Sequence, residues 1–182
     1  PARYNSSRLP GKPLRKIKGH PMIYWVAKQV KKSDLKKFIV ATDDKKIYQT
    51  CNFYNIPVKM TSSDCTNGTE RVAEISEDFD EDFWFVNVQG DEPNINPMAI
   101  NKLISEKRNN KGHQFIQAVN LIDDLALVED INTVKVLFSK NEYVQTYSRK
   151  PIKSQYDNNF YRCLGLYLYS KRFLNEFVSL KP

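Results

Sequence analysis

The sequence predicts an α/β fold in which a mostly parallel sheet, flanked by helices, is extended by antiparallel strands. Two observations carry this prediction. In the first part of the chain, short apolar segments typical of buried strands alternate with segments that have the spacing of amphipathic helices. In the later part, strand-like segments follow one another with little helix between them. A sheet of this class gathers its ligands at the carboxyl ends of its strands.

The first part of the chain supplies the alternating elements. Residues 1–18 read as a basic loop, and a helix begins near Pro21, since proline suits a first helical turn, and ends at about Lys32. Asp43 and Asp44 are suited to cap a helix that ends at about Asn55. Further helices are expected at 69–77 and 97–108, and strands at 38–42, 58–60 and 83–88.

The later part of the chain differs, because strands are expected there without long helices between them. They are expected at 115–121, 134–139, 143–147 and 163–169, which predicts a mixed sheet. With 182 residues and a mass of 21.2 kDa, the chain fits a single domain, residues 1–182, with a core of its own.

The composition is that of an ordinary globular protein, with 41% hydrophobic and 27% charged residues. No apolar run approaches the roughly 18 residues that a membrane-spanning helix needs, so a membrane-spanning protein is excluded. The net charge of +7 indicates an anionic partner, for which nucleic acid, a membrane surface and a phosphorylated small molecule are all candidates.

The cysteines and the N-terminus bear on the compartment. Cys51, Cys65 and Cys163 include no C-x-x-C pair and form no disulfide framework, which favours a reducing compartment over a structural zinc site. The N-terminal residues include no apolar segment typical of a signal peptide. We therefore expect a cytoplasmic protein.

A loop near the N-terminus combines cations with small residues. Segment 2–14 reads A-R-Y-N-S-S-R-L-P-G-K-P-L. Arg3, Arg8 and Lys12 can neutralise phosphate charge while Ser6 and nearby backbone N–H groups donate hydrogen bonds, so the loop suits a polyphosphate. It is not a P-loop, because the glycine spacing and the Lys-Ser/Thr ending are absent. The alternative is a solvated basic loop.

Acidic residues follow the most apolar predicted strand. Segment 86–93 reads V-N-V-Q-G-D-E-P. Because Mg²⁺ takes one or two carboxylates together with substrate phosphates, Asp91 and Glu92 just past this strand suit a magnesium site. The alternative is a turn whose acids cap the following helix.

Together these segments resemble the cytidylyltransferases that activate 3-deoxy-manno-octulosonate (Kdo), the CMP-Kdo synthetases. The pattern R-x(4)-R-L-P-G-K-P-L resembles the signature loop of sugar nucleotidyltransferases, and N-V-Q-G-D-E-P resembles a segment of the Kdo enzymes. The resemblance covers nearly the whole chain and implies a Rossmann-like nucleotidyltransferase fold. It also implies a first strand before Pro1 and, after Pro182, a segment that supplies a second metal carboxylate.

Two other regions resemble the same family. Segment 64–74, D-C-T-N-G-T-E-R-V-A-E, is similar to the part that recognises cytosine and ribose, with Cys65 and Asn67 in place of histidine and serine. The segments similar to the acid-sugar site are 134–136, 147–152 and 162–167. There Cys163 stands where the family has histidine, so a hydrogen-bond donor is lost and the identity of the sugar is left open.

The resemblance implies a role for each matching residue. The nucleotide-binding residues are Ala2, Arg3, Ser6, Arg8, Lys12, Gly68, Thr69 and Arg71. The sugar-binding residues are Gln89, Arg149, Cys163 and Tyr167. The catalytic residues are Arg3, Arg8, Lys12 and Asp91, with Asp91 also the ligand of Mg²⁺. From the residues without the resemblance, Arg149 is equally a surface arginine.

The hypothesis that follows is a homodimeric cytidylyltransferase that joins CTP and Kdo, releases pyrophosphate and feeds lipopolysaccharide or capsule synthesis. It needs neither a nucleic acid nor a membrane partner. Cys163 leaves open an amino-Kdo or another nonulosonic acid as the sugar. A hypothesis from a different class is a basic RNA-binding domain whose aromatic side chains stack on bases, although no RRM, KH or dsRBD signature is present.

Overall fold

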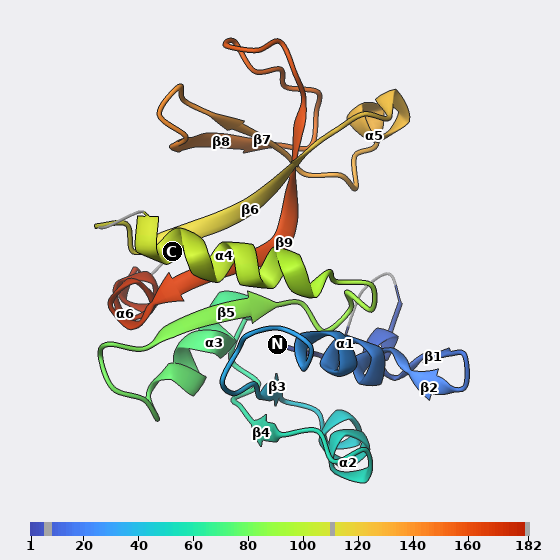
Figure 1. Ribbon diagram of the computed structural model, residues 1–182. Helices are drawn as coiled ribbons and strands as arrows, with labels where there is room; N and C mark the ends of the chain where they lie inside the picture. The colour runs from blue at the N-terminus through green and yellow to red at the C-terminus, as the bar shows by residue number, and fades with distance from the viewer. Residues whose placement is uncertain (6–8, 110–111, 181–182) are drawn as a thin grey trace. The chain divides into compact units, whose positions relative to one another are not determined.

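The computed structural model describes residues 1–5, 9–109, 112–180 and divides into two compact units. The first unit comprises Pro1–Ile116 and Leu166–Pro182, and the second comprises Gln117–Gly165. Strands β6 (Phe115–Leu121) and β9 (Tyr161–Ser170) each contribute residues to both units (Figure 1).

Most helices of the described residues lie in the first unit. They are the 3-10 helix η1 (Lys12–Leu14) and the α-helices α1 (Met22–Val30), α2 (Lys45–Phe53), α3 (Gly68–Ser76), α4 (Pro97–Asn109) and α6 (Lys171–Ser179). Its strands besides β6 and β9 are β1 (Lys16–Ile17), β2 (His20–Pro21), β3 (Val40–Thr42), β4 (Val58–Met60) and β5 (Trp84–Val88). The second unit adds α5 (Leu125–Glu129), β7 (Lys135–Phe138) and β8 (Val144–Ser148).

The α/β class and the antiparallel strands expected in the later part of the chain are confirmed, but β5 pairs antiparallel rather than in parallel as expected. Strand β3 pairs with β4 in parallel. In contrast, β5 pairs with β9, and β7 with both β8 and β9, all antiparallel. The physical reason is that β9 enters beside β5 from the opposite direction, so no crossover helix joins these neighbours. Helices α5 and α6 and strands β1 and β2 were not predicted.

Two clusters of buried side chains form the core of the first unit. Helix α1 buries Ile23, Val26, Ala27 and Val30 on one face, as the sequence spacing predicts. Ile23 and Ala27 from this face pack with β3 and α2 in the first cluster. The second cluster includes Val72 and Ala73 of α3 with Tyr169 of β9 and Leu174 of α6. The first cluster includes Val40 of β3, and Phe85 of β5 packs against the second.

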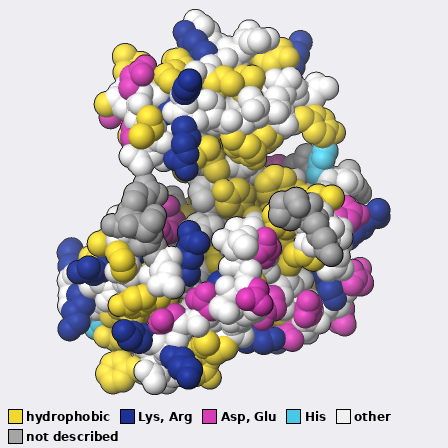
Figure 2. All heavy atoms as spheres, turned by 180° about the vertical axis from the view of Figure 1, so that it is seen from behind, with side chains coloured by type: hydrophobic (Ala, Val, Ile, Leu, Met, Phe, Trp, Pro, Cys, Tyr) yellow, Lys and Arg dark blue, Asp and Glu magenta, His cyan; other side chains and the backbone are white. Residues whose placement is uncertain are grey.

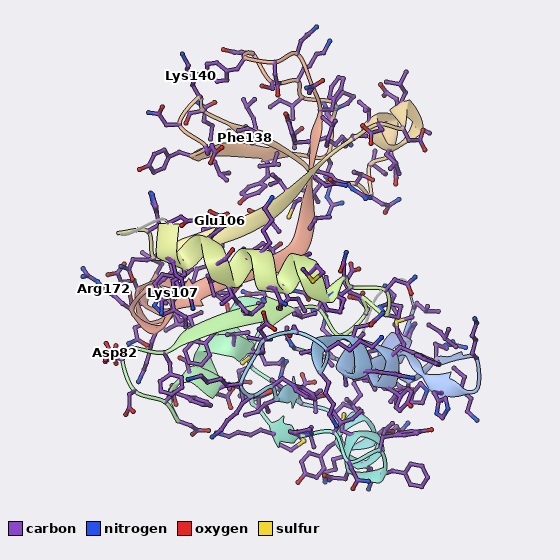
Figure 3. All side chains as sticks on the ribbon, viewed as in Figure 1. Asp82, Glu106, Lys107, Phe138, Lys140 and Arg172 are labelled. Atoms are coloured by element: carbon purple, nitrogen blue, oxygen red, sulfur yellow. The ribbon has the colours of Figure 1, made fainter. Side chains whose placement is uncertain are left out.

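A row of stacked aromatic rings continues the second cluster. The ring centroids of Phe115 and Tyr169 are 5.5 Å apart, and those of Tyr169 and Phe173 are also 5.5 Å apart, with planes within 2° of parallel. Trp84 makes a cation–π contact with Lys107 on α4, which is labelled in Figure 3. Nζ of Lys107 lies 4.9 Å from the centroid of the Trp84 ring. In the part of the chain that the structure describes, no helix combines the length and apolar character needed to cross a membrane.

The predicted cap at α2 yields a stability prediction. Oδ1 of Asp44 accepts hydrogen bonds from the backbone N–H groups of Lys46 and Ile47 at 2.8 and 2.9 Å. Alanine has no side-chain acceptor, so both N–H groups would lose this hydrogen-bond partner. Asp44→Ala should therefore lower the free energy of unfolding by about 1 kcal/mol. Urea denaturation measures the change. The neighbouring Lys45→Ala is the control, since Lys45 is exposed; an equal loss in both variants would contradict the cap's role.

Candidate active site

The N-terminal loop is closed by a hydrogen bond between its two ends. The backbone N–H of Gly11 donates to the carbonyl of Tyr4 at 2.8 Å, and Gly11 has a left-handed backbone with φ of 67°. A Cβ atom at residue 11 would lie 3.0 Å from the Tyr4 ring, so both backbone conformation and space favour glycine. This turn leads directly into Lys12. The predicted residues Ser6 and Arg8 lie outside the described residues.

Lys12 and Asp91 meet although they are far apart in the sequence. Nζ of Lys12 lies 2.6 Å from Oδ2 of Asp91, and the two side chains remain 36% and 40% exposed. The pair brings the basic loop to the acidic turn after β5. An exposed ion pair of this kind contributes at most about 1 kcal/mol to stability, so its main consequence is the placement of two functional groups.

Gly90 lets the two segments approach each other. Its N–H donates to the carbonyl of Pro1 at 3.0 Å, and a Cβ atom at residue 90 would lie 2.8 Å from both that carbonyl oxygen and the Cβ of Ala2. The N–H of Ala2 donates to the carbonyl of Ala41 at 2.8 Å. The backbone at Ala2 is therefore fixed between the ends of β3 and β5, while the next residue, Arg3, is exposed.

Helix α3 begins with a capped N-terminus. Oδ1 of Asn67 accepts from the N–H groups of Thr69 and Glu70 at 2.9 and 3.0 Å. The Glu70 carboxylate accepts from the N–H of Thr66 at 2.6 Å and from the Asn67 amide at 2.8 Å. These hydrogen bonds, that from the Thr66 backbone foremost, lower the pKa of Glu70. The capped helix predicted for this segment is confirmed, with Asn67 as the N-cap.

A row of polar groups joins the start of α3 to the end of β5. A Cβ atom at Gly68 would lie 3.5 Å from the amide nitrogen of Gln89. The hydroxyl of Thr69 lies 3.1 Å from that of Tyr169, which accepts from the Asn87 amide at 3.4 Å. Oδ1 of Asn87 in turn accepts from the Gln89 amide at 3.3 Å. The predicted residues Gly68, Thr69 and Gln89 therefore lie in one neighbourhood.

Asn87 and Tyr169 are the members of this row that the sequence analysis does not assign. Asn87 is only 1% exposed and Tyr169 3%. The signal for Asn87 was present, because an amide in the middle of the apolar strand β5 needs hydrogen-bond partners. The sequence contains no comparable signal for Tyr169, since aromatic residues are common in strands.

Arg71 of α3 is buried, and its guanidinium is bound to other groups of the protein. The residue is 3% exposed. Its guanidinium donates to Oδ2 of Asp43 at 2.9 Å, to the carbonyl of Ser62 at 3.2 Å and to the hydroxyl of Thr61. The side chain thereby ties the segment after β3 to the segment after β4. Its predicted contact with the nucleoside stays a prediction.

The second unit holds Arg149 on a loop that is anchored by a buried lysine. Nζ of Lys135, a residue with 0% exposure, donates to the carbonyls of Asp130, Thr133 and Arg149 at 2.8, 2.9 and 2.8 Å. These acceptors use all three ammonium hydrogens. The Arg149 guanidinium is exposed and donates to the carbonyl of Ile131 at 2.8 Å.

The predicted sugar-binding residues are divided between the two units. Gln89 and Tyr167 belong to the first unit, and Arg149 and Cys163 to the second. The ring of Tyr167 stacks with that of Phe115, with centroids 6.1 Å apart. Each unit therefore carries groups suited to a polar ligand.

Asp91 is the residue of the predicted set that suits a metal ion. Within the described residues, no group of three or more His, Cys, Asp and Glu side chains is arranged to hold one. The Asp91 carboxylate already faces a cation, the Lys12 ammonium. Mg²⁺ commonly takes one or two carboxylates and completes its coordination with phosphates and water, so Asp91 fits a magnesium ion whose other ligands come from a substrate.

Comparison with known proteins identifies the family. A family model described as "Cytidylyltransferase" matches residues 1–182. A 3-deoxy-manno-octulosonate cytidylyltransferase of Fusobacterium nucleatum is 40% identical, over 99% of this chain and 75% of that protein. The chain belongs to the 3-deoxy-manno-octulosonate cytidylyltransferase family. A relative of the same name from Tolumonas auensis is 38% identical, over 98% of this cytidylyltransferase and 75% of its own length.

Solved structures agree with the predicted nucleotidyltransferase fold. A CMP:2-keto-3-deoxy-manno-octonic acid synthetase complexed with CTP superposes with a TM-score of 0.89 at 31% identity, over 100% of this cytidylyltransferase and 76% of that chain. An inositol-1-phosphate CTP transferase from T. maritima has a TM-score of 0.65 at 15% identity, over 97% and 68% of the two chains, and shares the fold. The predicted family and fold are confirmed.

The position of Arg71 yields a second stability prediction. Arg71→Met leaves Asp43 without its guanidinium partner at a largely buried site, so the free energy of unfolding should fall by about 3 kcal/mol. Chemical denaturation measures it. The control is Arg172→Met on α6 (Figure 3), because Arg172 is 74% exposed in its ion pair with Glu176 and its loss should cost less than about 0.5 kcal/mol. Similar losses in the two variants would contradict the structural role of Arg71.

Proposed function

We propose that this chain transfers the cytidylyl group of CTP to 3-deoxy-manno-octulosonate and releases pyrophosphate. The observation that carries the proposal is the meeting of Lys12 and Asp91 at 2.6 Å, which joins the basic loop to the acidic turn in a member of this cytidylyltransferase family. A cation and a carboxylate at the end of an apolar strand suit a nucleoside triphosphate and its metal.

The reaction is an in-line displacement at phosphorus. The anomeric 2-hydroxyl of the sugar forms a bond to the α-phosphorus of CTP, its proton is released, and the bond from the α-phosphorus to the bridging oxygen of pyrophosphate breaks. No side-chain nucleophile is required. The work of the protein is therefore to position the two substrates and to neutralise charge on the leaving group.

The basic loop neutralises the leaving group in this proposal. Lys12 is held at the loop's end by the Gly11 turn, and Arg3 is exposed beside the fixed backbone of Ala2. Their positive charges stabilise the charge that develops on pyrophosphate, together with the sequence-assigned Arg8. Asp91 would hold Mg²⁺, which when bound adds further neutralisation of phosphate charge.

The nucleoside is assigned to the start of α3. Gly68 has no side chain, which allows a ligand to approach the backbone closely. The Thr69 hydroxyl is positioned by its contact with Tyr169 at 3.1 Å. On the sugar side, Asn87 orients the Gln89 amide, and the exposed guanidinium of Arg149 can bind a sugar carboxylate through paired N–H groups.

The observations favour this function over RNA binding. The rings of Phe115, Tyr169 and Phe173 stack on one another with centroids 5.1–5.5 Å apart, so their faces are used within the protein rather than for bases. On the face in Figure 2, Lys and Arg side chains are interspersed with Asp and Glu. A nucleic-acid site usually presents a basic stripe instead.

A homodimer that assembles through the second unit is part of the proposal. This unit exposes several large apolar side chains, among them Leu125, Ile131, Tyr143 and Val144, with exposed fractions of 73%, 67%, 58% and 39%. Where exposed apolar side chains form a contiguous patch they often mark an interface, and a two-fold dimer buries the same residues on both copies. Sedimentation velocity tests this directly, and a monomer at micromolar concentration would contradict it.

A cytoplasmic location completes the proposal. All three cysteines are described, and no disulfide joins them. Burial raises the pKa of the Cys51 thiol to about 11, which keeps it protonated at neutral pH. Thiols that stay reduced are typical of a reducing compartment.

The carboxylate of Asp91 provides the main test. Asp91→Asn should lower kcat for the release of pyrophosphate from CTP in the presence of Kdo by at least about a hundredfold. An amide is a poor ligand for magnesium, and the substitution removes the negative charge of the carboxylate. The fold should persist, since the ion pair is half exposed. Asp82→Asn, the same substitution at an exposed position before β5, is the control. Activity of Asp91→Asn within tenfold of the unmodified protein would contradict the metal role.

Lys12 distinguishes the nucleotide side of the site from the sugar side. Lys12→Ala removes a charge assigned to the triphosphate and the leaving group, so kcat/KM for CTP should fall by about a hundredfold while the KM for the sugar changes little. Steady-state kinetics with each substrate varied in turn gives both constants. Lys16→Ala, at an exposed position nearby, should leave them unchanged. If the variant instead raises mainly the KM for the sugar, Lys12 contacts the sugar rather than the triphosphate, which would contradict its assignment.

A further inference from the structure

Three side chains of the second unit form a hydrogen-bonded row that the mechanism above does not use. The hydroxyl of Tyr147 on β8 donates to Oε1 of Gln117 on β6. Nε2 of Gln117 donates to Sγ of Cys163 on β9 at 2.5 Å. The row therefore joins three strands and ends at Cys163, a residue of β9 that the sequence analysis assigns to the sugar.

The Tyr147 hydroxyl fixes which end of the Gln117 amide faces Cys163. A glutamine amide has an acceptor end and a donor end. Because the hydroxyl binds Oε1, the nitrogen end is directed to the thiol. An amide nitrogen carries two hydrogens, and the bond to Sγ uses one of them. Gln117 thus presents its donor end to Cys163, while its acceptor end is directed to Tyr147.

Cys163 does not itself supply a strong donor. A thiol is a weak hydrogen-bond donor, and Sγ of Cys163 lies 3.4 Å from the carbonyl of Leu164, to which it donates. Gln117 and Cys163 are both partly exposed, and Tyr147 is 47% exposed. A ligand that reaches Cys163 therefore meets the Gln117 amide as the stronger polar group.

We propose that Gln117 selects the sugar by donating its amide N–H to a neutral hydroxyl, and that Tyr147 is the positioning residue that enforces this choice. The inference rests on the proposed function, which assigns Cys163 to the sugar side of the site. It names the substrate class: an acid sugar with a hydroxyl at this place, rather than one with an ammonium group.

The discrimination follows from the hydrogen-bonding capacity of the two substituents. A hydroxyl accepts as well as donates, so it pairs with the Gln117 N–H. An ammonium group only donates, so two donors would face each other and both would lose hydrogen bonds made in water. The amide oxygen would suit an ammonium group, but its hydrogen bond with the Tyr147 hydroxyl directs it to Tyr147 rather than to Cys163.

The selectivity between two sugars tests the role of Tyr147. We would measure kcat/KM for Kdo and for its 8-amino analogue at neutral pH, where the amine is protonated. The unmodified protein should prefer Kdo. Tyr147→Phe removes only the hydroxyl and allows the amide to turn, so the ratio should shift about tenfold toward the amino sugar, with the KM for CTP unchanged. A purely structural role would not move this ratio.

Two further variants complete the experiment. Gln117→Leu should lower kcat/KM for Kdo about tenfold and reduce the preference between the sugars. Tyr156→Phe is the matched control, because Tyr156 is 56% exposed in the same unit, and it should keep the unmodified ratio. Thermal unfolding of each variant verifies that it is folded.

The outcomes separate the inference from the function on which it rests. A preference of the unmodified protein for the amino sugar would overturn the inference, and so would an unchanged ratio in Tyr147→Phe. An equal shift in Tyr156→Phe would overturn it as well. If the unmodified protein releases no pyrophosphate from CTP with either sugar, the proposed function fails and the inference falls with it.

Discussion

The backbone contact at Gly90 is the constraint on which the arrangement of the first unit depends. Two backbone hydrogen bonds hold the start of the chain. The N–H of Ala2 donates to the carbonyl of Ala41 within the buried β3, and the N–H of Gly90 beyond β5 donates to the carbonyl of Pro1. Only a residue without a side chain fits at position 90, because a Cβ would lie 2.8 Å from its neighbours. The basic loop then continues from a fixed origin, and Lys12 reaches Asp91. A few backbone atoms, rather than the charged groups themselves, therefore decide where the charges meet.

The polar groups around this contact are supported by packed apolar surfaces. Asn87 lies almost fully buried within β5, and its amide is satisfied by Tyr169, whose ring belongs to the stacked aromatic row. The row restricts the Tyr169 ring, and the ring restricts the amide. Arg71 also restricts its neighbours, because its guanidinium binds groups that follow β3 and β4. Hydrophobic packing thus fixes the orientation of side chains that would otherwise have several rotamers.

Local patterns in the sequence were enough to predict most elements, whereas the joint role of the basic loop and the acidic turn followed only from the family resemblance. The apolar spacing of α1, the Asp44 cap and the strand before Asp91 each depend on neighbouring residues, so they could be read directly. The strand partners could not be predicted in this way, because the pairing of β5 with β9 joins residues about eighty positions apart in the sequence. The contact of Tyr169 with Asn87 and that of Gln117 with Cys163 are long-range for the same reason. Arg71 was predicted as a ligand contact, whereas its visible partners are Asp43, Ser62 and Thr61, whose proximity depends on tertiary folding.

The buried ammonium of Lys135 has a consequence for how the second unit can change in evolution. It holds three backbone carbonyls, and a carbonyl is present at every residue whatever its side chain. The loop that precedes β7 can therefore exchange its side chains while the anchor stays the same. Lys135 itself has no equivalent freedom, because a shorter or uncharged side chain would leave these carbonyls without their shared donor. One buried cation thus holds these segments whatever side chains surround it, including those beside Arg149.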